Sequence, residues 1–236
     1  MKSQANRPIP LALTALIAFF SALVALGVSN GHSAHAHSEP HSAVAHVVHP
    51  RSSATVTRKE LVFRGEMRRL WEDHITWTRL AVISLISGSP DTNATVARLL
   101  RNQADIGNAV KPFYGKAAGN ALTAELRRHI LIAADLIAAA KAGDQAKLAE
   151  AQSRWERNAD DLASLLNRAN PRHWPRAALR AMLGEHLRLT TAEVVARLGG
   201  DWDADVAAYD QVHRHALQMA DTLATGLVRQ FPRRFR

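Results

Sequence analysis

The stretch Leu70–Leu85, LWEDHITWTRLAVISL, has the apolar spacing of a helix with one buried face. Its apolar residues recur at intervals of three and four, and a histidine stands among them. Because residues three and four apart lie on the same side of an α-helix, one face collects Leu70, His74, Trp77, Ala81 and Leu85. The pattern predicts a helix that turns one imidazole toward the protein interior.

Three later stretches place a histidine on an inward face in the same way. The first face contains Leu122, Leu126, His129, Ala133 and Leu136, and the second contains Leu179, Leu183 (or Met182), His186 and Thr190. Near the end of the chain, a third face would contain Val206, Tyr209, His213, Ala216, Ala220 and Leu223. Four helices are therefore expected to direct one imidazole each toward the interior.

From Lys59 onward the sequence has no strand-like alternation, and Gly, Pro and Asp cluster at regular intervals. The fold class predicted is an all-α helical bundle over 59–231, with about six helices paired into three αα-hairpins. Three aspartates stand where a helix is expected to begin and are predicted caps: Asp91, Asp144 and Asp201. The expected helices are 59–88, 91–110, 119–141, 144–168, 175–198 and 202–230.

The three hairpins align on His74, His129 and His186 as a degenerate repeat. Apolar residues recur three positions before each histidine, directly after it and eight positions on: Trp71, Leu126, Leu183; Ile75, Ile130, Leu187; Val82, Ile137, Val194. Fourteen residues past the aspartates come Asp105, Asn158 and His215. The alternative is that ordinary helical periodicity produces the match by chance.

Residues 1–36 are interpreted as a signal peptide or, if uncut, a signal anchor. Lys2 and Arg7 precede an uncharged apolar run, Ile9–Gly27, and small residues suited to cleavage follow at Ala34–Ala36. Both interpretations place the remaining chain outside the cytoplasm. The chain contains no cysteine, so a metal would have to be held by imidazole, carboxylate or thioether groups.

Half of the twelve histidines lie in the stretch Gly31–Pro50, GHSAHAHSEPHSAVAHVVHP. Its Ser, Ala, Gly and Pro content predicts a flexible segment over 37–58. Neutral imidazoles on such a segment suit Cu(II), Zn(II) or Ni(II). Cleavage after Ala36 would leave His37, His41, His46 and His49 as candidate ligands. The alternative is a low-complexity linker without a metal.

The net charge is +9, and the chain ends in RQFPRRFR. The basic tail, 232–236, together with Arg229, is suited to an anionic envelope surface, and the alternative is a frayed, solvated end. No recognition motif supports nucleic-acid binding.

Core histidines from facing helices are a common way to build a metal site in a bundle. The candidates are His74, His129, His186 and His213, with Asp210 three residues before His213, and with Asp105 and His215. His215 and Met219 would offer copper an imidazole and a thioether. The alternative for each histidine is an ordinary core residue bonded to a neighbour. A polar band, Asn102, Gln103, Asp105 and Asn108, faces either a buried network or solvent.

The strings LWEDHITWTR (70–79), NQADIGNAVKPFYG (102–115), ANPRHWP (169–175) and MADTL (219–223) resemble a group of small exported bacterial helical proteins. The resemblance covers most of residues 65–231 and implies an exported helical bundle, but it implies no activity.

The function favoured by the sequence is that of an exported protein binding a divalent transition metal, copper or zinc, through the tail and the core histidines. The alternative is an extracytoplasmic binding or scaffold module whose histidines are structural. An enzyme is disfavoured, because the sequence has no Glu-x-x-His pair of the di-iron type and no evident nucleophile arrangement.

Overall fold

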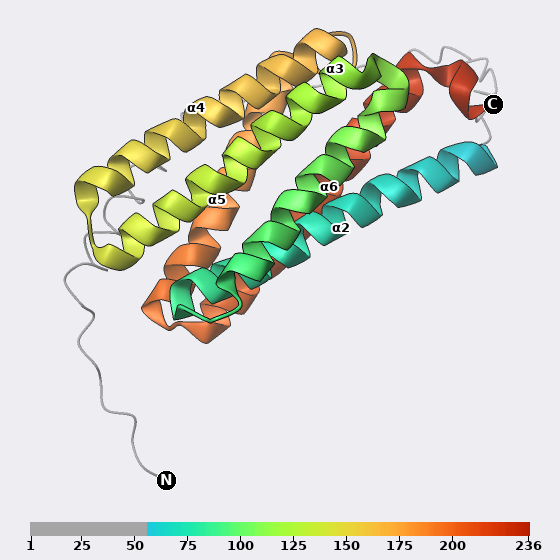
Figure 1. The fold of residues 1–236 in the computed structure, drawn as a ribbon. Coiled ribbons are helices and arrows are strands. Elements are labelled where there is room, and N and C mark those ends of the chain that lie inside the picture. Colours follow the sequence, from blue (N-terminus) through green and yellow to red (C-terminus); the bar gives the residue numbers. More distant parts are fainter. Residues whose placement is uncertain (1–55) are drawn as a thin grey trace, which may run out of the picture.

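The structure, a computed structural model, describes residues 56–236 and is an all-helical bundle, as the sequence predicts (Figure 1). The long helices run side by side and enclose one main apolar core. Five α-helices and a short 3₁₀ helix make up this part of the chain: α2 (Arg58–Ser87), α3 (Thr92–Ala142), α4 (Gln145–Ala169), α5 (Arg176–Gly199), α6 (Trp202–Gln230) and η1 (Pro232–Phe235).

The second and third expected helices form one element, α3, so this region contains five α-helices rather than six. Inside α3, Gly115 leaves the helical region of backbone space, with φ 84° and ψ 170°. A Cβ placed on Gly107 would lie 2.6 Å from the Gly119 carbonyl oxygen. Continuous helix would hold residues twelve apart about 18 Å from each other. The chain therefore reverses direction within α3, as Figure 1 shows.

Two of the three predicted aspartate caps are confirmed. The side chain of Asp144 accepts a hydrogen bond from Lys147 N, and that of Asp201 accepts one from Ala204 N, so each satisfies a free amide at a helix start. Asp91 was wrongly predicted as a cap: it makes no capping bond, and its Oδ1 instead accepts from Ser84 Oγ at 2.9 Å.

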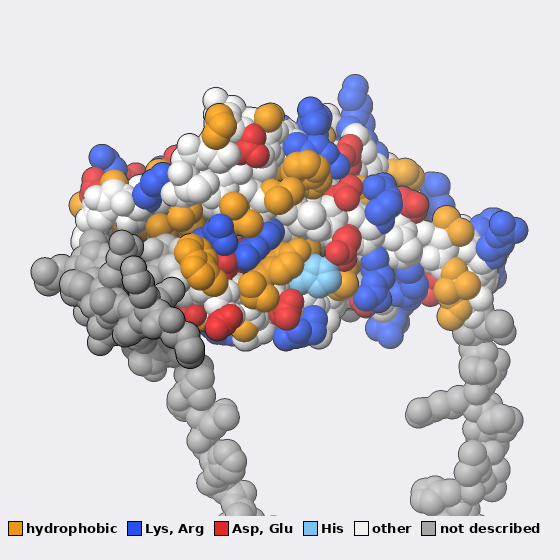
Figure 2. All heavy atoms as spheres, turned by 90° about the horizontal axis from the view of Figure 1, so that it is seen from below, with side chains coloured by type: hydrophobic (Ala, Val, Ile, Leu, Met, Phe, Trp, Pro, Cys, Tyr) orange, Lys and Arg blue, Asp and Glu red, His pale blue; other side chains and the backbone are white. Residues whose placement is uncertain are grey.

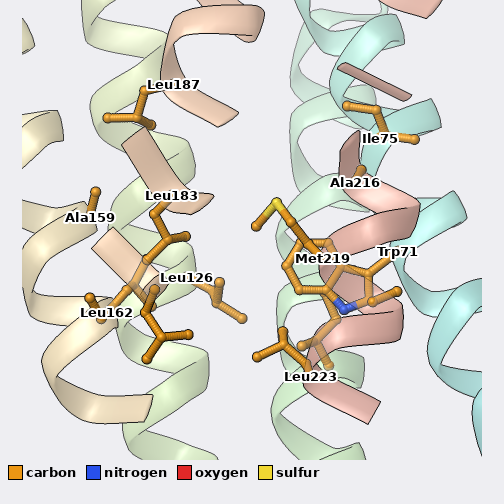
Figure 3. Close-up of a cluster of buried hydrophobic side chains, with 14 of the residues drawn as sticks. Trp71, Ile75, Leu126, Ala159, Leu162, Leu183, Leu187, Ala216, Met219 and Leu223 are labelled. Atoms are coloured by element: carbon orange, nitrogen blue, oxygen red, sulfur yellow. The ribbon is translucent and has the colours of Figure 1, made fainter. Parts of the chain in front are cut away.

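The helices are neighbours in the order α2, α3, α4, α5, α6, and α6 packs back on α2. This arrangement closes a ring around the core. Figure 3 shows its apolar filling, with Trp71 and Met219 from α2 and α6 on one side and Leu126, Leu162 and Leu183 from α3, α4 and α5 on the other. Because every helix contributes to one packed interior, polar groups placed there are held by several elements at once.

The C-terminal end packs against the start of the bundle. Phe235 in η1 is buried and its ring lies 5.0 Å from that of Phe63 and 5.8 Å from that of Phe113, between centroids. The neighbouring arginines of the tail stay exposed. Figure 2 shows basic and acidic side chains interspersed on one face of the molecule. None of the helices in residues 56–236 has the length and apolar character of a membrane span.

Candidate functional site: a buried histidine cluster

Four histidines from four helices meet in the interior, in what we call the histidine cluster: His74 (α2), His129 (α3), His186 (α5) and His215 (α6). His186 is central. Its ring centroid lies 6.0 Å from that of His74, 6.1 Å from that of His129 and 6.2 Å from that of His215. The prediction that separate helices direct imidazoles toward one interior region therefore describes His74, His129 and His186.

The histidine cluster is largely removed from water. His74, His129 and His186 are each buried, whereas His215 is half-buried. Burial lowers the pKa of His74 and of His129 to about 4, because a charged imidazole loses its hydration there. Burial also lowers the pKa of His186 well below its usual value, and the neighbouring imidazoles add to this effect. The three buried rings are therefore neutral near pH 7.

A hydrogen-bond chain fixes the tautomer of His129. Its Nδ1 lies 2.9 Å from Oδ1 of Asn158. The Asn158 amide nitrogen donates to the backbone oxygen and the carboxylate of Glu125, at 3.2 and 3.0 Å. Asn158 Oδ1 is consequently the acceptor, and His129 Nδ1 carries the proton. In the neutral ring, Nε2 therefore keeps its lone pair.

His74 has a different partner. Nε2 of the fully buried Gln103 lies 3.2 Å from His74 Nδ1 and also donates to the Leu99 carbonyl oxygen at 2.9 Å. The same nitrogen lies 3.3 Å from Asn102 Oδ1, so its two hydrogens face three acceptors. His74 belongs to the cluster, but its Nδ1 already lies against the Gln103 amide.

His186 and His215 hold unused lone pairs. Nδ1 of His186 is buried and has no hydrogen-bond partner. Nε2 of His215 lies 2.9 Å from the backbone oxygen of Met182, which can only accept. The proton of His215 is therefore on Nε2, and in the neutral ring Nδ1 keeps its lone pair. His129, His186 and His215 thus each have a nitrogen available to accept a proton or a ligand bond.

The same contacts recur around the three buried histidines. Gln103 and Asn158 lie 29 residues after the histidines they bond, and His215 lies equally far after His186. Side-chain nitrogens on the second helices donate to the carbonyl oxygens four residues before each histidine: Asn102 to Leu70, Asn158 to Glu125 and His215 to Met182. The apolar residues eight positions after the histidines, Val82, Ile137 and Val194, pack into one cluster.

Asp91 follows His74 by two residues more than Asp144 follows His129 or Asp201 follows His186. Counted from the histidines, the position of Asp144 and Asp201 is occupied by Ser89, whose carbonyl oxygen accepts from Thr92 N at 3.2 Å. Counting fourteen residues from Asp91 leads to Asp105, which is exposed. Counting the same number from Ser89 leads to Gln103, which is completely buried. The polar band of α3 therefore divides: Asn102 and Gln103 face the interior, and Asp105 and Asn108 face solvent.

Two other predicted ligands do not join the histidine cluster. His213 is half-buried, and its Nε2 lies 2.7 Å from Glu72 Oε1 near the surface. Asp210 is exposed. The predicted face of α6 is confirmed at Ala216, Ala220 and Leu223, which are buried. It is wrong nearer the start of the helix, where Val206 is exposed and Tyr209 half-buried. The tail candidates, His37, His41, His46 and His49, lie outside the residues that the structure describes.

Within residues 56–236, no group of three or more histidine, aspartate or glutamate side chains is placed so that it could hold a metal ion as it stands. Comparison with protein families, curated proteins and solved structures finds no match for this chain.

Proposed function

We propose that the protein binds a divalent transition metal, copper or zinc, through His129, His186 and His215, and that it acts outside the cytoplasm. One observation carries the proposal: the ring of His186 lies 6.1 and 6.2 Å from the rings of the other two, and each of the three has a nitrogen with a free lone pair. Imidazole is a good ligand for both metals, and three imidazoles leave one position open on a tetrahedral ion.

The protonation state of the cluster favours metal binding. A metal ion competes with protons for imidazole nitrogens, so ligands with a low pKa are free at neutral pH. Burial lowers the pKa of His129 to about 4 and that of His186 below its usual value. Asn158 holds His129 by its Nδ1–H, which is how ligating histidines are generally oriented. The Met182 carbonyl oxygen does the same for His215.

The spacing of the rings is close to that of a bound set. Two imidazoles on one tetrahedral ion have centroids about 5 Å apart, given metal–nitrogen distances near 2.1 Å. The two distances from His186 to its neighbours, 6.1 and 6.2 Å, exceed this by about 1 Å. The ring planes of His129 and His215 are inclined by 28° and 18° to that of His186, so the rings would have to turn for three nitrogens to meet at one ion.

A three-hairpin repeat supplies the framework in this proposal. Its support is the recurrence of contacts around the three buried histidines, and of left-handed glycines fourteen residues after each of them. These are Gly88, Gly143 and Gly200, with φ of 68°, 69° and 71°. Each hairpin would then present one histidine to a common layer, and its second helix would present Gln103, Asn158 or His215 at the equivalent place.

The N-terminal features complete the proposal. The apolar run Ile9–Gly27 is suited to export, and the histidine-rich stretch would gather metal ions loosely before the cluster holds one. The cluster would confer selectivity, because the packed helices limit which side chains can reach an ion, whereas a low-complexity stretch sets no such limit.

The test is a metal titration of the full chain in which the six histidines of Gly31–Pro50 are replaced by asparagine. We expect one equivalent of Zn(II) or Co(II) to bind more tightly than about 10 μM in calorimetry. His186→Gln and His215→Gln should each weaken binding at least about tenfold. His213→Gln is the matched control, because that ring bonds to Glu72 and lies outside the cluster.

His215→Gln should disturb folding less than His186→Gln, because His215 is only half-buried whereas His186 is buried. Thermal unfolding of both variants, without metal, separates lost ligands from lost structure. If the tail-substituted chain binds no ion at this affinity, the cluster is a packing device. The scaffold interpretation then replaces the metal-binding one.

A further inference from the structure

A surface groove between α5 and α6 is lined in part by His215 of the histidine cluster. Its volume is about 310 Å³, and its lining includes His173, Met182, His215 and Met219. Met182 and His215 are half-buried, and Met219 is 1% exposed at the groove floor. His215 thus has two surroundings: it lines the groove, and its ring lies 6.2 Å from that of His186 in the interior.

The groove gathers sulfur ligands in a chain that has few of them. The sequence has four methionines and no cysteine, and two of the methionines, Met182 and Met219, line this groove. They come from adjacent helices, α5 and α6, and line the groove together with His215. Soft thioether groups with an imidazole select Cu(I) over harder ions such as Zn(II).

The orientation of His215 favours a ligand role in the groove. Its Nε2–H donates to the Met182 backbone oxygen, so the same residue that offers a thioether also holds the imidazole. The lone pair of the neutral ring is then on Nδ1. Because a hydrogen bond from the other ring nitrogen fixes the ring of a ligating histidine, this contact prepares His215 to accept a metal ion.

We propose that the α5–α6 groove is a Cu(I) site formed by the thioether sulfurs of Met182 and Met219 and the imidazole of His215, through which copper enters the histidine cluster. The inference rests on the proposed function and names copper as its metal. No electron transfer is required, because the ion binds as Cu(I) in exchange for solvent or a carrier ligand. His215 is shared by the groove and the cluster, so an ion bound there is adjacent to His186.

The experiment uses the full chain with the six histidines of Gly31–Pro50 replaced by asparagine, as above. Cu(I) is added anaerobically against the chromophoric chelator bicinchoninate. The Met182→Leu/Met219→Leu double variant should bind Cu(I) at least about tenfold more weakly and should leave Zn(II) affinity unchanged. Leucine nearly conserves the volume of methionine, so the fold is expected to persist. Met67→Leu, a buried methionine outside the groove lining, is the control.

X-ray absorption provides a second readout. Copper bound to the parent chain should show sulfur scatterers, and copper bound to the double variant should show nitrogen alone. Unchanged Cu(I) affinity with no sulfur scattering would overturn the groove site, even if Zn(II) still binds through His186. Conversely, Cu(I) could bind through sulfur while Zn(II) affinity is the same in His186→Gln as in the parent chain. This result would support the groove site and reject the cluster site.

Discussion

Nδ1 of His129 lies 2.9 Å from Oδ1 of Asn158, and these two residues are buried on facing helices, α3 and α4. The Asn158 amide nitrogen donates in turn to Glu125. One asparagine therefore satisfies two polar groups and fixes which nitrogen of His129 is protonated. Around the other two buried histidines the contacts differ, because Gln103 bonds to His74, whereas His215 only approaches His186 and leaves Nδ1 of His186 without a partner.

Replacement of this asparagine should cost both stability and metal affinity. In Asn158→Ala, the buried His129 Nδ1–H loses its acceptor, so the free energy of unfolding should fall by about 1–3 kcal/mol. Zn(II) affinity should fall about 10- to 100-fold, since His129 is no longer oriented. Urea unfolding and calorimetry measure these effects. Asn108→Ala, exposed on α3, should change neither; equal losses in both variants would contradict the role of Asn158.

The close approach inside α3 predicts a strong effect of adding one methyl group. A Cβ on Gly107 would lie 1.9 Å from Thr123 Oγ1 and 2.6 Å from the Gly119 carbonyl oxygen. Gly107→Ala should therefore destabilise the protein by about 1–3 kcal/mol, as overpacking does. Gly184→Ala has open space around its Cβ and should stabilise α5 by about 0.5–1 kcal/mol. Thermal unfolding compares the two, and similar shifts in both would refute the backbone contact.

The metal-free protein should lose stability in acid. The pKa of His74 and His129 is about 4 in the fold because burial disfavours the charged rings, whereas an unfolded histidine titrates near pH 6.5. Between these values the unfolded chain binds protons that the folded chain does not, so the free energy of unfolding falls as pH falls from 6.5 toward 4. The loss should approach about 3 kcal/mol per histidine.

Urea unfolding at pH 7, 6 and 5 measures this dependence. Below pH 6.5, the free energy of unfolding should fall less steeply with falling pH in His129→Gln than in the parent protein. The difference is the contribution of one imidazole. Carboxylates also titrate in acid, but they are the same in both proteins, so the difference between the two slopes isolates His129. Identical slopes would show that His129 is accessible to protons in the folded state.

The sequence was sufficient for the inward direction of His74, His129 and His186, because apolar spacing of three and four defines a helix face independently of the fold. It was also sufficient for the helix breaks at Gly88, Gly143 and Gly200, where a positive φ favours glycine. These features depend on local geometry alone. Periodicity therefore predicted the helix face on which each histidine lies, but it left their relative depth along the bundle open.

The long-range partners could not be predicted from local patterns. Gln103 is adjacent to Asn102 in a polar band whose sequence is compatible with either a buried network or a solvent-exposed helix face. Only the approach of α2 decides that both are completely buried. On α6, the predicted inward face began with Val206 and Tyr209, which are exposed and half-buried, and it therefore included His213. His215, predicted separately as a ligand beside Met219, is the residue that approaches His186.

A second buried polar group lies between α2, α5 and α6. Arg79 NH1 lies 2.9 Å from Glu193 Oε1, and Arg79 NH2 lies 2.8 Å from Asp205 Oδ2, which Arg197 also contacts at 2.8 Å. Both acids are essentially unexposed. Burial raises the pKa of Glu193, whose Oε2 has no partner. Burial also acts on Asp205, but hydrogen bonds from the two arginines outweigh it and lower its pKa.

Because the pKa of Asp205 is lowered and that of Glu193 is raised, replacing each carboxylate by its amide should affect stability differently. In Asp205→Asn, two arginines lose the carboxylate they share, and the free energy of unfolding should fall by about 3–5 kcal/mol, as when one partner of a buried ion pair is removed. Glu193→Gln removes a buried charge that is only partly compensated, so its effect should stay below about 1 kcal/mol. Urea unfolding at pH 7 measures both, and each variant controls for the other because carboxylate becomes amide in both. Comparable losses would show that Glu193 carries as much of the ionic network as Asp205, contrary to the direction of its pKa.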